Sequence, residues 1–260
     1  MTIDLDLGAA SSTRRVEVCL PATSSTKLLV SGCPPVRPSD PLRRPDRSGV
    51  HHGSLISQCS EADRPTETWP SIVARHAHHS LLNLGIGGQC HLDQFMARAI
   101  RDLPAHANSL EVGINIVNAA SLIERSFLPA FHGFLDTMRD GHPATPILII
   151  TPIICPSAEN RPGPTLMGPD HRYFTPDRPA EMSIGALSLT RIRELLRGAV
   201  KLRQSQGDAS LQLLDGLELF GPDDVVDLPD GLHPNADGYR RMAQRFLPLA
   251  QSSGLFSSSE

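Results

Sequence analysis

Three features that would assign a chain to a large class of proteins are missing from this sequence of 260 residues. The 24 lysines and arginines stand against 28 acidic residues, a net charge of -4, so no basic field exists to bind nucleic acid. No apolar run approaches the roughly 20 residues that cross a bilayer, so no membrane partner is expected. The N-terminus, MTIDLD, is acidic where a signal peptide is basic, which predicts a cytoplasmic location.

Metal-binding and disulfide patterns are also lacking. The five cysteines are odd in number and form no CxxC pair, which is typical of reduced thiols in a cytosolic protein. The eleven histidines cluster at His51-His52 and between His76 and His79, but no Cys or carboxylate accompanies them at ligand spacing. We therefore predict no metal and no cofactor.

The composition changes near residue 48. Residues 1–47 hold short β-type runs followed by a Pro- and Arg-rich stretch, which predicts a small β-rich segment and a linker. Residues 48–260 alternate between strand and helix patterns, as expected for one α/β domain with a mostly parallel sheet. Strands are predicted near 80–84, 110–116, 146–152 and 211–214, and helices near 69–75, 92–103, 127–138, 192–199 and 239–247. Residues 155–180 show no periodicity and predict a long loop, often a lid or binding wall.

The clearest candidate for chemistry is Asp230-Gly231-Leu232-His233, just before the last predicted helix. An Asp three residues before a His can accept a hydrogen bond from Nδ1 and leave Nε2 free as a base. Taken alone, the same residues also suit a turn and a helix start.

Two further segments strengthen this hypothesis. Residues 83–89, NLGIGGQ, follow a predicted strand, and their glycines allow backbone N–H groups to face a ligand. Alone, this segment also fits a tight turn or a weak phosphate loop. Asn115, in Gly113-Ile114-Asn115, can donate from its amide, although a lone Asn there also suits a turn. His91 is either a substrate contact or a helix cap, and Glu111 is given no role.

The order of these motifs resembles the SGNH (GDSL) hydrolase family. A glycine and serine turn after a strand comes first, then N-x-G-x-x-G, then G-x-N, then D-x-x-H before the final helix. The resemblance covers roughly residues 48–250. It is nearest to actinobacterial members with an N-terminal β-sandwich module, of which residues 14–40 look like a shortened piece.

The resemblance implies a three-layer α/β/α, flavodoxin-like fold with a short N-terminal β appendage, and metal-free esterase or acyltransferase chemistry on a small acyl ester, in specialised metabolism. It implies His233 as the base, Asp230 as its orienting partner, and Gly88 and Asn115 as oxyanion donors. The partner expected is a small-molecule substrate, and the sequence does not indicate an oligomeric state.

The chain departs from the family at its first block, which normally reads G-D-S. Aligning Gly53 with the block glycine puts Ser54 at the aspartate and Leu55 at the nucleophilic serine. Leucine has no lone pair and forms no acyl-enzyme. A register shifted by one residue makes Ser54 the nucleophile but places His52 at the glycine position.

Ser57 and Cys59 are the remaining candidate nucleophiles. If none acts, the chain either binds a ligand in the old cleft or uses Asp230 and His233 in non-covalent acid/base chemistry such as cyclisation or elimination. Leu55 would then line the pocket.

Overall fold

The computed structural model describes residues 47–252 and residue 255. The predicted β appendage and linker therefore lie outside the described residues, and the domain division at residue 47 stays a prediction. The strands are β1 (Ser48–Gly53), β2 (Ser80–Gly85), β3 (Ala107–Glu111), β4 (Ile147–Ile150), β5 (Leu166–Met167), β6 (Tyr173–Phe174) and β7 (Leu211–Leu214). The α-helices are α1 (Leu55–Gln58), α2 (Trp69–His76), α3 (Gln94–Asp102), α4 (Ile114–Asn118), α5 (Glu124–Gly141), α6 (Leu189–Ser205), α7 (Gly216–Leu219) and α8 (Ala236–Ser252).

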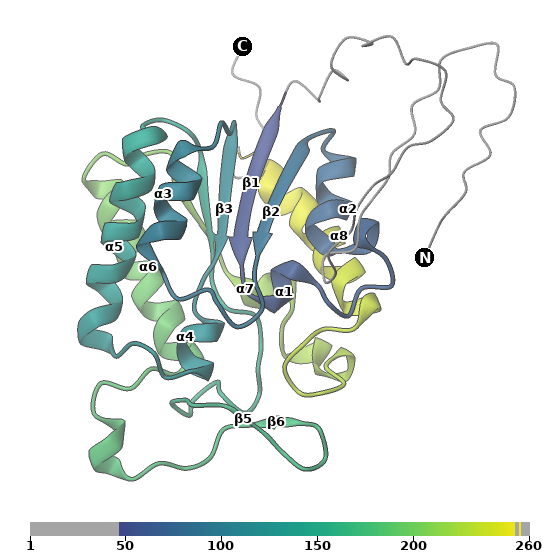
Figure 1. Ribbon diagram of the computed structural model, residues 1–260, viewed down its shortest axis with the longest axis vertical. Coiled ribbons are helices and arrows are strands. Elements are labelled where there is room, and N and C mark those ends of the chain that lie inside the picture. The colour runs from purple at the N-terminus through teal and green to yellow at the C-terminus, as the bar shows by residue number, and fades with distance from the viewer. Residues whose placement is uncertain (1–46, 253–254, 256–260) are drawn as a thin grey trace, which may run out of the picture.

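Five of these strands form one parallel sheet in the order β2-β1-β3-β4-β7. Helices α3, α5 and α6 cover one face and α2 and α8 the other (Figure 1). This is the predicted three-layer α/β/α fold. The strand order reverses between β1 and β3, and in such sheets ligands bind beyond the carboxyl ends of the strands at that point.

The helices form where apolar side chains recur at helical spacing. In α5 the buried residues are Phe127, Phe131, Phe134, Leu135 and Met138, the stripe that the sequence predicts. Burying each phenylalanine stabilises the fold by roughly 1.5–3 kcal/mol relative to exposure. Strand β4 is buried at all four positions, as a central strand covered on both faces must be.

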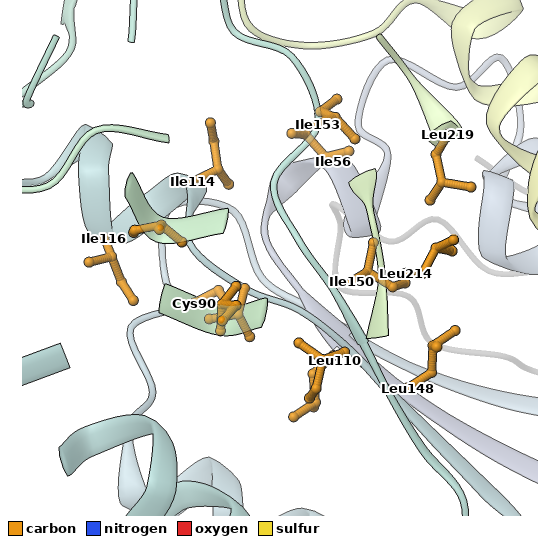
Figure 2. Close-up of a cluster of buried hydrophobic side chains, with 14 of the residues drawn as sticks. Ile56, Cys90, Leu110, Ile114, Ile116, Leu148, Ile150, Ile153, Leu214 and Leu219 are labelled. Atoms are coloured by element: carbon orange, nitrogen blue, oxygen red, sulfur yellow. The ribbon is translucent and has the colours of Figure 1, made fainter. Parts of the chain in front are cut away.

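The core reaches the carboxyl edge of the sheet. Figure 2 shows side chains of β3, β4 and β7 packed together with Ile56 from α1 and Ile114 from α4. Both short helices follow directly after strands, β1 and β3, and each anchors itself by a buried isoleucine. The turns that carry the candidate site are thereby fixed to the core.

The predicted strand over residues 110–116 is wrong in its extent. Strand β3 ends at Glu111, Gly113 has a φ of 128°, and α4 begins at Ile114. Apolar residues alternate at positions 110, 112, 114 and 116, across the end of β3 and the start of α4, and this strand-like pattern conceals the change to a buried helix.

The apolar face of α3 is also displaced from its predicted position. Met96, Ala97 and Ile100 are buried, whereas Phe95 is 60% exposed and Ala99 also faces solvent. The helix packs on α5, and its buried face is made by Met96, Ala97 and Ile100 and excludes Phe95.

The segment expected as a long loop, residues 155–180, is irregular except for a small antiparallel hairpin of β5 and β6. In Figure 1 this hairpin lies below the carboxyl edge of the sheet, beyond α1 and α4. Within the described ranges, no helix has the length and apolar character needed to cross a membrane.

Candidate active site

A cavity of about 180 Å³ opens at the carboxyl edge of the sheet. Its lining residues come from the turns after β1, β2 and β3, from β6 and from the turn before α8: Ser54, Leu55, Ile56, Gly88, Ile114, Asn115, Asn118, Tyr173, Leu232 and His233. The structure thus brings five of the six site residues predicted from sequence around one space. The sixth, Asp230, lies behind His233.

The Asp230–His233 pair is held by three hydrogen bonds. His233 Nδ1 lies 2.7 Å from Asp230 Oδ2, while the backbone N–H groups of His233 and Leu232 donate to Oδ1 at 2.7 and 2.9 Å. The carboxylate therefore accepts the Nδ1 proton and leaves Nε2 of His233 without that proton, in the form that a base requires. The ring is packed edge to face against Tyr173, with centroids 5.5 Å apart.

The electrostatics of the pair favour an ionised carboxylate. Burial acts to raise the pKa of Asp230, but the hydrogen bonds donated by the backbone and ring of His233 outweigh it and the pKa lies below its ordinary value. A negative charge thus stands behind the imidazole, where it stabilises a positive charge on His233.

The turn after β1 carries the first motif. A Cβ on Gly53 would lie 2.1 Å from Ser57 Oγ, so only glycine fits there. His52 belongs to the strand, stacks on Phe134 and has its Nδ1 2.8 Å from Leu84 O. The turn thus requires glycine at residue 53, whereas His52 belongs to the strand before it.

Ser54 and Leu55 begin α1. Ser54 is its N-cap, and Oγ accepts the backbone N–H of Ile56 at 3.2 Å. Leu55 is the first helical residue, and both Ser54 and Leu55 border the cavity. Leu55 is the residue that the unshifted alignment assigns to the family's serine position.

The glycine segment after β2 is tied to α1. Gly87 N–H donates to Gln58 Oε1 at 2.8 Å, and Asn83 Nδ2 donates to Ser57 O at 2.7 Å. Gly88 has a φ of 70°, which residues with a side chain adopt only under strain. His91 supports this turn, since its ring nitrogens lie 2.8 Å from Gly88 O and from Ser121 Oγ.

Asn115 is oriented by its own hydrogen bond. Its Oδ1 accepts the backbone N–H of Cys90 at 3.0 Å, so its amide nitrogen is directed elsewhere. In the part of the chain that the structure describes, this nitrogen and the backbone N–H groups of Leu55 and Gly88 make no hydrogen bond to protein. Three donors without protein partners therefore come from residues that border one cavity.

Ser57 and Cys59 do not border this cavity. Ser57 is fully buried and donates to Glu111 Oε2 at 2.5 Å. The Cys59 thiol donates to Ile56 O, and burial raises its pKa well above the ordinary value. Burial likewise raises the pKa of the Cys90 thiol. Neither thiol is presented as a thiolate, which a cysteine nucleophile requires.

Sequence reasoning assigned no role to Glu111, yet it lies at the end of a buried polar chain. His51 links Ser109 and Ser57 through its two ring nitrogens, both at 2.8 Å, and Ser57 donates to Glu111. Burial raises the pKa of Glu111 to about 7 and lowers that of His51 to about 3. The alignment of His51 with Ser109 across β1 and β3 becomes visible only once the strand order is known.

The sequence predicts that the histidine clusters do not bind a metal ion. Among residues 47–252 and 255, no group of three or more His, Cys, Asp or Glu side chains is arranged to hold a metal ion. His51 and His52 are buried core histidines on opposite faces of β1, in contact with Trp69 and Phe134 respectively.

Comparison with known proteins gives two positive findings and one negative. Residues 47–158 match the model of the GDSL-like lipase/acylhydrolase family. No curated protein matches the chain. Among solved structures, a salicylyl-acyltransferase, SsfX3, from a tetracycline biosynthetic pathway is similar at 26% identity and a TM-score of 0.67, over 80% of this chain and 55% of that one.

Two carbohydrate esterases share the fold at lower identity. A family two enzyme from Clostridium thermocellum, solved with cellohexaose, has 14% identity and a TM-score of 0.57 over 81% of this chain and 65% of its own. A family three enzyme from Talaromyces cellulolyticus has 14% identity and a TM-score of 0.53 over 80% of this chain and 98% of its own. The chain spans little more than half of the acyltransferase. Residues 47–158 thus resemble the GDSL-like lipase/acylhydrolase family, and the described chain shares the fold of a solved acyltransferase and of a GDSL-like lipase.

Proposed function

We propose that this chain is an esterase or acyltransferase that acts on a small acyl ester, with His233 as general base. One observation carries the proposal: a histidine oriented by a carboxylate borders the same cavity as three hydrogen-bond donors without protein partners. The combination suits acyl transfer, in which a base must act close to a carbonyl oxygen that becomes negative.

The site supports the following division of labour. The carbonyl oxygen accepts hydrogen bonds from Gly88 N–H, Leu55 N–H and the amide of Asn115, which stabilise the oxyanion. His233 Nε2 takes a proton from the attacking hydroxyl and returns it to the leaving oxygen, while Asp230 stabilises the imidazolium. In the family, the serine contributes its backbone N–H as well as its hydroxyl. Leu55 has the same backbone N–H but no hydroxyl.

Two different groups could attack the carbonyl carbon in this site. In the first, Ser54 attacks, since it is the one serine among the residues that border the cavity. Its Oγ accepts from Ile56 N–H and keeps its own proton to give to a base. In the second, His233 activates water or an acceptor alcohol directly and no acyl-enzyme forms.

The similar acyltransferase supports transfer to an alcohol as well as hydrolysis. That protein carries the name salicylyl-acyltransferase and belongs to a biosynthetic pathway. By analogy with that protein, we propose that this chain also acts in specialised metabolism. A cytoplasmic location is consistent with Cys59, Cys90 and Cys155, which are unpaired in the described chain.

A second function, ligand binding or non-covalent acid/base chemistry, is favoured by Leu55 itself. An apolar side chain at the wall, beside an intact Asp230–His233 pair, suits proton abstraction from a bound ligand, with Gly88 and Asn115 stabilising an enolate or alkoxide. Cyclisation and elimination are reactions of this kind.

Hydrolysis of 4-nitrophenyl acetate and butyrate, with fluorophosphonate labelling, separates these routes. We would compare the native chain with Ser54→Asp, Leu55→Ser and His233→Ala. Ser54→Asp removes the hydroxyl but keeps a residue that caps helices well, so it is a matched control for the cap. Adding Leu55→Ser to it restores the complete G-D-S block.

The outcomes divide clearly. Native activity that is lost in both Ser54→Asp and His233→Ala, with labelling at Ser54, establishes the covalent route. Native activity that survives Ser54→Asp but needs His233 establishes direct attack. Activity that appears only when Leu55→Ser is introduced would refute a native esterase and leave the second function.

A further inference from the structure

A second carboxamide borders the cavity beside Asn115. Asn118 is the last residue of α4, three positions after Asn115, and both line the cavity together with Ile114. Residues three apart on a helix lie on the same side, with Cβ atoms about 5–6 Å apart. Asn118 lies outside the motifs on which the family resemblance rests.

The side chain of Asn118 is oriented in the same way as that of Asn115. Its Oδ1 accepts the hydroxyl of Thr165 at 2.9 Å, and its backbone oxygen accepts the N–H of Thr165 at 2.9 Å. Thr165 belongs to the irregular segment 155–180 that covers this edge of the sheet. With both oxygens of Asn118 engaged, its amide nitrogen has no hydrogen-bond partner among the described residues, and the residue is only half-buried.

The cavity also has two distinguishable sides. Under the proposed function, His233 delivers its proton to the leaving oxygen, so its neighbours Leu232 and Tyr173 are on the leaving-group side. With the carbonyl oxygen bound by Asn115, an acyl chain directed away from His233 passes along α4. Ile114 and Asn118 are the α4 residues available to it.

We propose that the amide of Asn118 donates a hydrogen bond to a second oxygen on the acyl group, and that the preferred substrates are esters of oxygenated acids. This inference rests on the proposed function. One helical turn between Asn115 and Asn118 places that oxygen on the β or γ carbon, with the chain carbons between the two oxygens against Ile114. Asn118 is therefore a specificity-determining residue.

The competing explanation is that Asn118 only fastens segment 155–180 through Thr165. Three variants separate these roles. Asn118→Asp keeps an acceptor for the Thr165 hydroxyl but has no amide donor, and Asn118→Ala lacks both. Thr165→Val removes the fastening hydroxyl and leaves the amide of Asn118 in place.

Binding is measured first, with a pair of amides that the enzyme does not need to hydrolyse. Pentanamide and 3-methoxypropanamide have nearly the same shape and differ by a CH₂ in place of an ether oxygen. Their Kd values are determined by ligand-observed NMR for the native chain and each variant. We expect the Kd ratio to shift against the ether by about threefold to tenfold in Asn118→Ala and Asn118→Asp. In Thr165→Val the ratio should stay within twofold of the native value.

The matching 4-nitrophenyl pentanoate and 3-methoxypropanoate then test the same ratio in kcat/KM. A ratio unchanged in both Asn118 variants, with native melting temperatures, overturns the inference, and so does a shift in Thr165→Val as large as that in Asn118→Ala. If neither ester is hydrolysed but the amide ratio shifts as expected, the inference stands as a binding preference and only the esterase proposal fails.

Discussion

The two sides of the cavity differ in how much of the family's chemistry they retain. On the side of α8, Asp230 and His233 have the side chains of the family motif and are joined by two hydrogen bonds, and Leu232 N–H donates a third to Asp230. On the side of α1, the unshifted alignment puts Leu55 where the family has its serine, and Leu55 is the first residue of the helix. Yet α1 still begins at that residue, capped by Ser54, so its first backbone N–H remains available to an oxyanion.

This difference separates backbone functions from side-chain functions. A donor supplied by the main chain survives any substitution that leaves the local fold intact, whereas a nucleophile disappears with its side chain. Under the proposed function, the α1 side therefore supplies a backbone donor to the oxyanion, and the side chain of Leu55 cannot form an acyl-enzyme. What the protein does depends on whether Ser54 or a bound hydroxyl supplies the nucleophile.

The largest effect is expected on the α8 side, from His233→Ala. Removing a general base lowers the rate by about 10²- to 10⁴-fold, and we expect a loss of this size in kcat/KM for 4-nitrophenyl esters. Asp230→Asn should act in the same direction, because an amide does not hold the Nδ1 proton of His233 in place. His132→Ala, on α5 and outside the cavity lining, is the matched control. Native kcat/KM in His233→Ala would show that the α8 side takes no part.

The second-largest effect is expected from a change in one of the proposed oxyanion donors, Asn115. Asn115→Asp keeps the acceptor for Cys90 N–H but has no amide donor, so the turn is preserved while the oxyanion loses one hydrogen bond. Loss of one such donor lowers kcat by about 10²- to 10³-fold. If KM rises instead and kcat is unchanged, Asn115 binds the ground state and is not an oxyanion donor.

The α8 side was predictable from sequence because its interactions are local. Asp230 and His233 lie three residues apart on one turn, Gly88 lies in the turn after β2, and Asn115 is the second residue of α4, which follows β3. Glu111 was not predictable, because its partner Ser57 is 54 positions away and meets it only through the pairing of β1 with β3. The length of β3 was also wrong, since apolar residues alternate across the end of β3 and the start of α4.

The register at the first motif was the hardest case. Two alignments of Gly53, Ser54 and Leu55 with the family's G-D-S block were compatible with the sequence alone. A Cβ added at Gly53 would clash with Ser57, and this contact depends on how α1 folds back over β1. Packing of this kind is set by tertiary contacts, which a motif search does not contain.

A smaller effect is expected in the buried chain beneath α1, through Glu111→Gln. Because the pKa of Glu111 is raised to about 7, its contribution to stability is complete below pH 4.5 and is lost as the pH rises to about 7. His51, with its pKa lowered to about 3, contributes in the opposite sense: stability is present above pH 6.5 and is lost as the pH falls. Between pH 4.5 and 6.5 these two slopes oppose each other in the native chain.

Glu111→Gln removes one of the two slopes. The free energy of unfolding in urea should then rise with pH between about 4.5 and 6.5, by up to about 1.4 kcal/mol per unit from His51. His52, whose pKa burial also lowers, adds to the rise. In Glu111→Gln combined with His51→Gln, the His51 part of the slope should be absent. A flat profile in Glu111→Gln alone would mean that His51 is not held neutral.

The smallest effect concerns the helix that follows His233. Asn235 Oδ1 accepts the N–H of Gly238 at 2.9 Å and caps α8. Asn235→Ala should lower the free energy of unfolding by about 1 kcal/mol, a shift in Tm of about 2–4 °C, while Asn235→Ser should lose less. Because the three hydrogen bonds between Asp230 and its neighbours do not involve Asn235, kcat/KM should stay within about twofold of native. A larger loss of activity than of stability would show that the α8 side depends on its helix for orientation, and that local hydrogen bonds alone do not position His233.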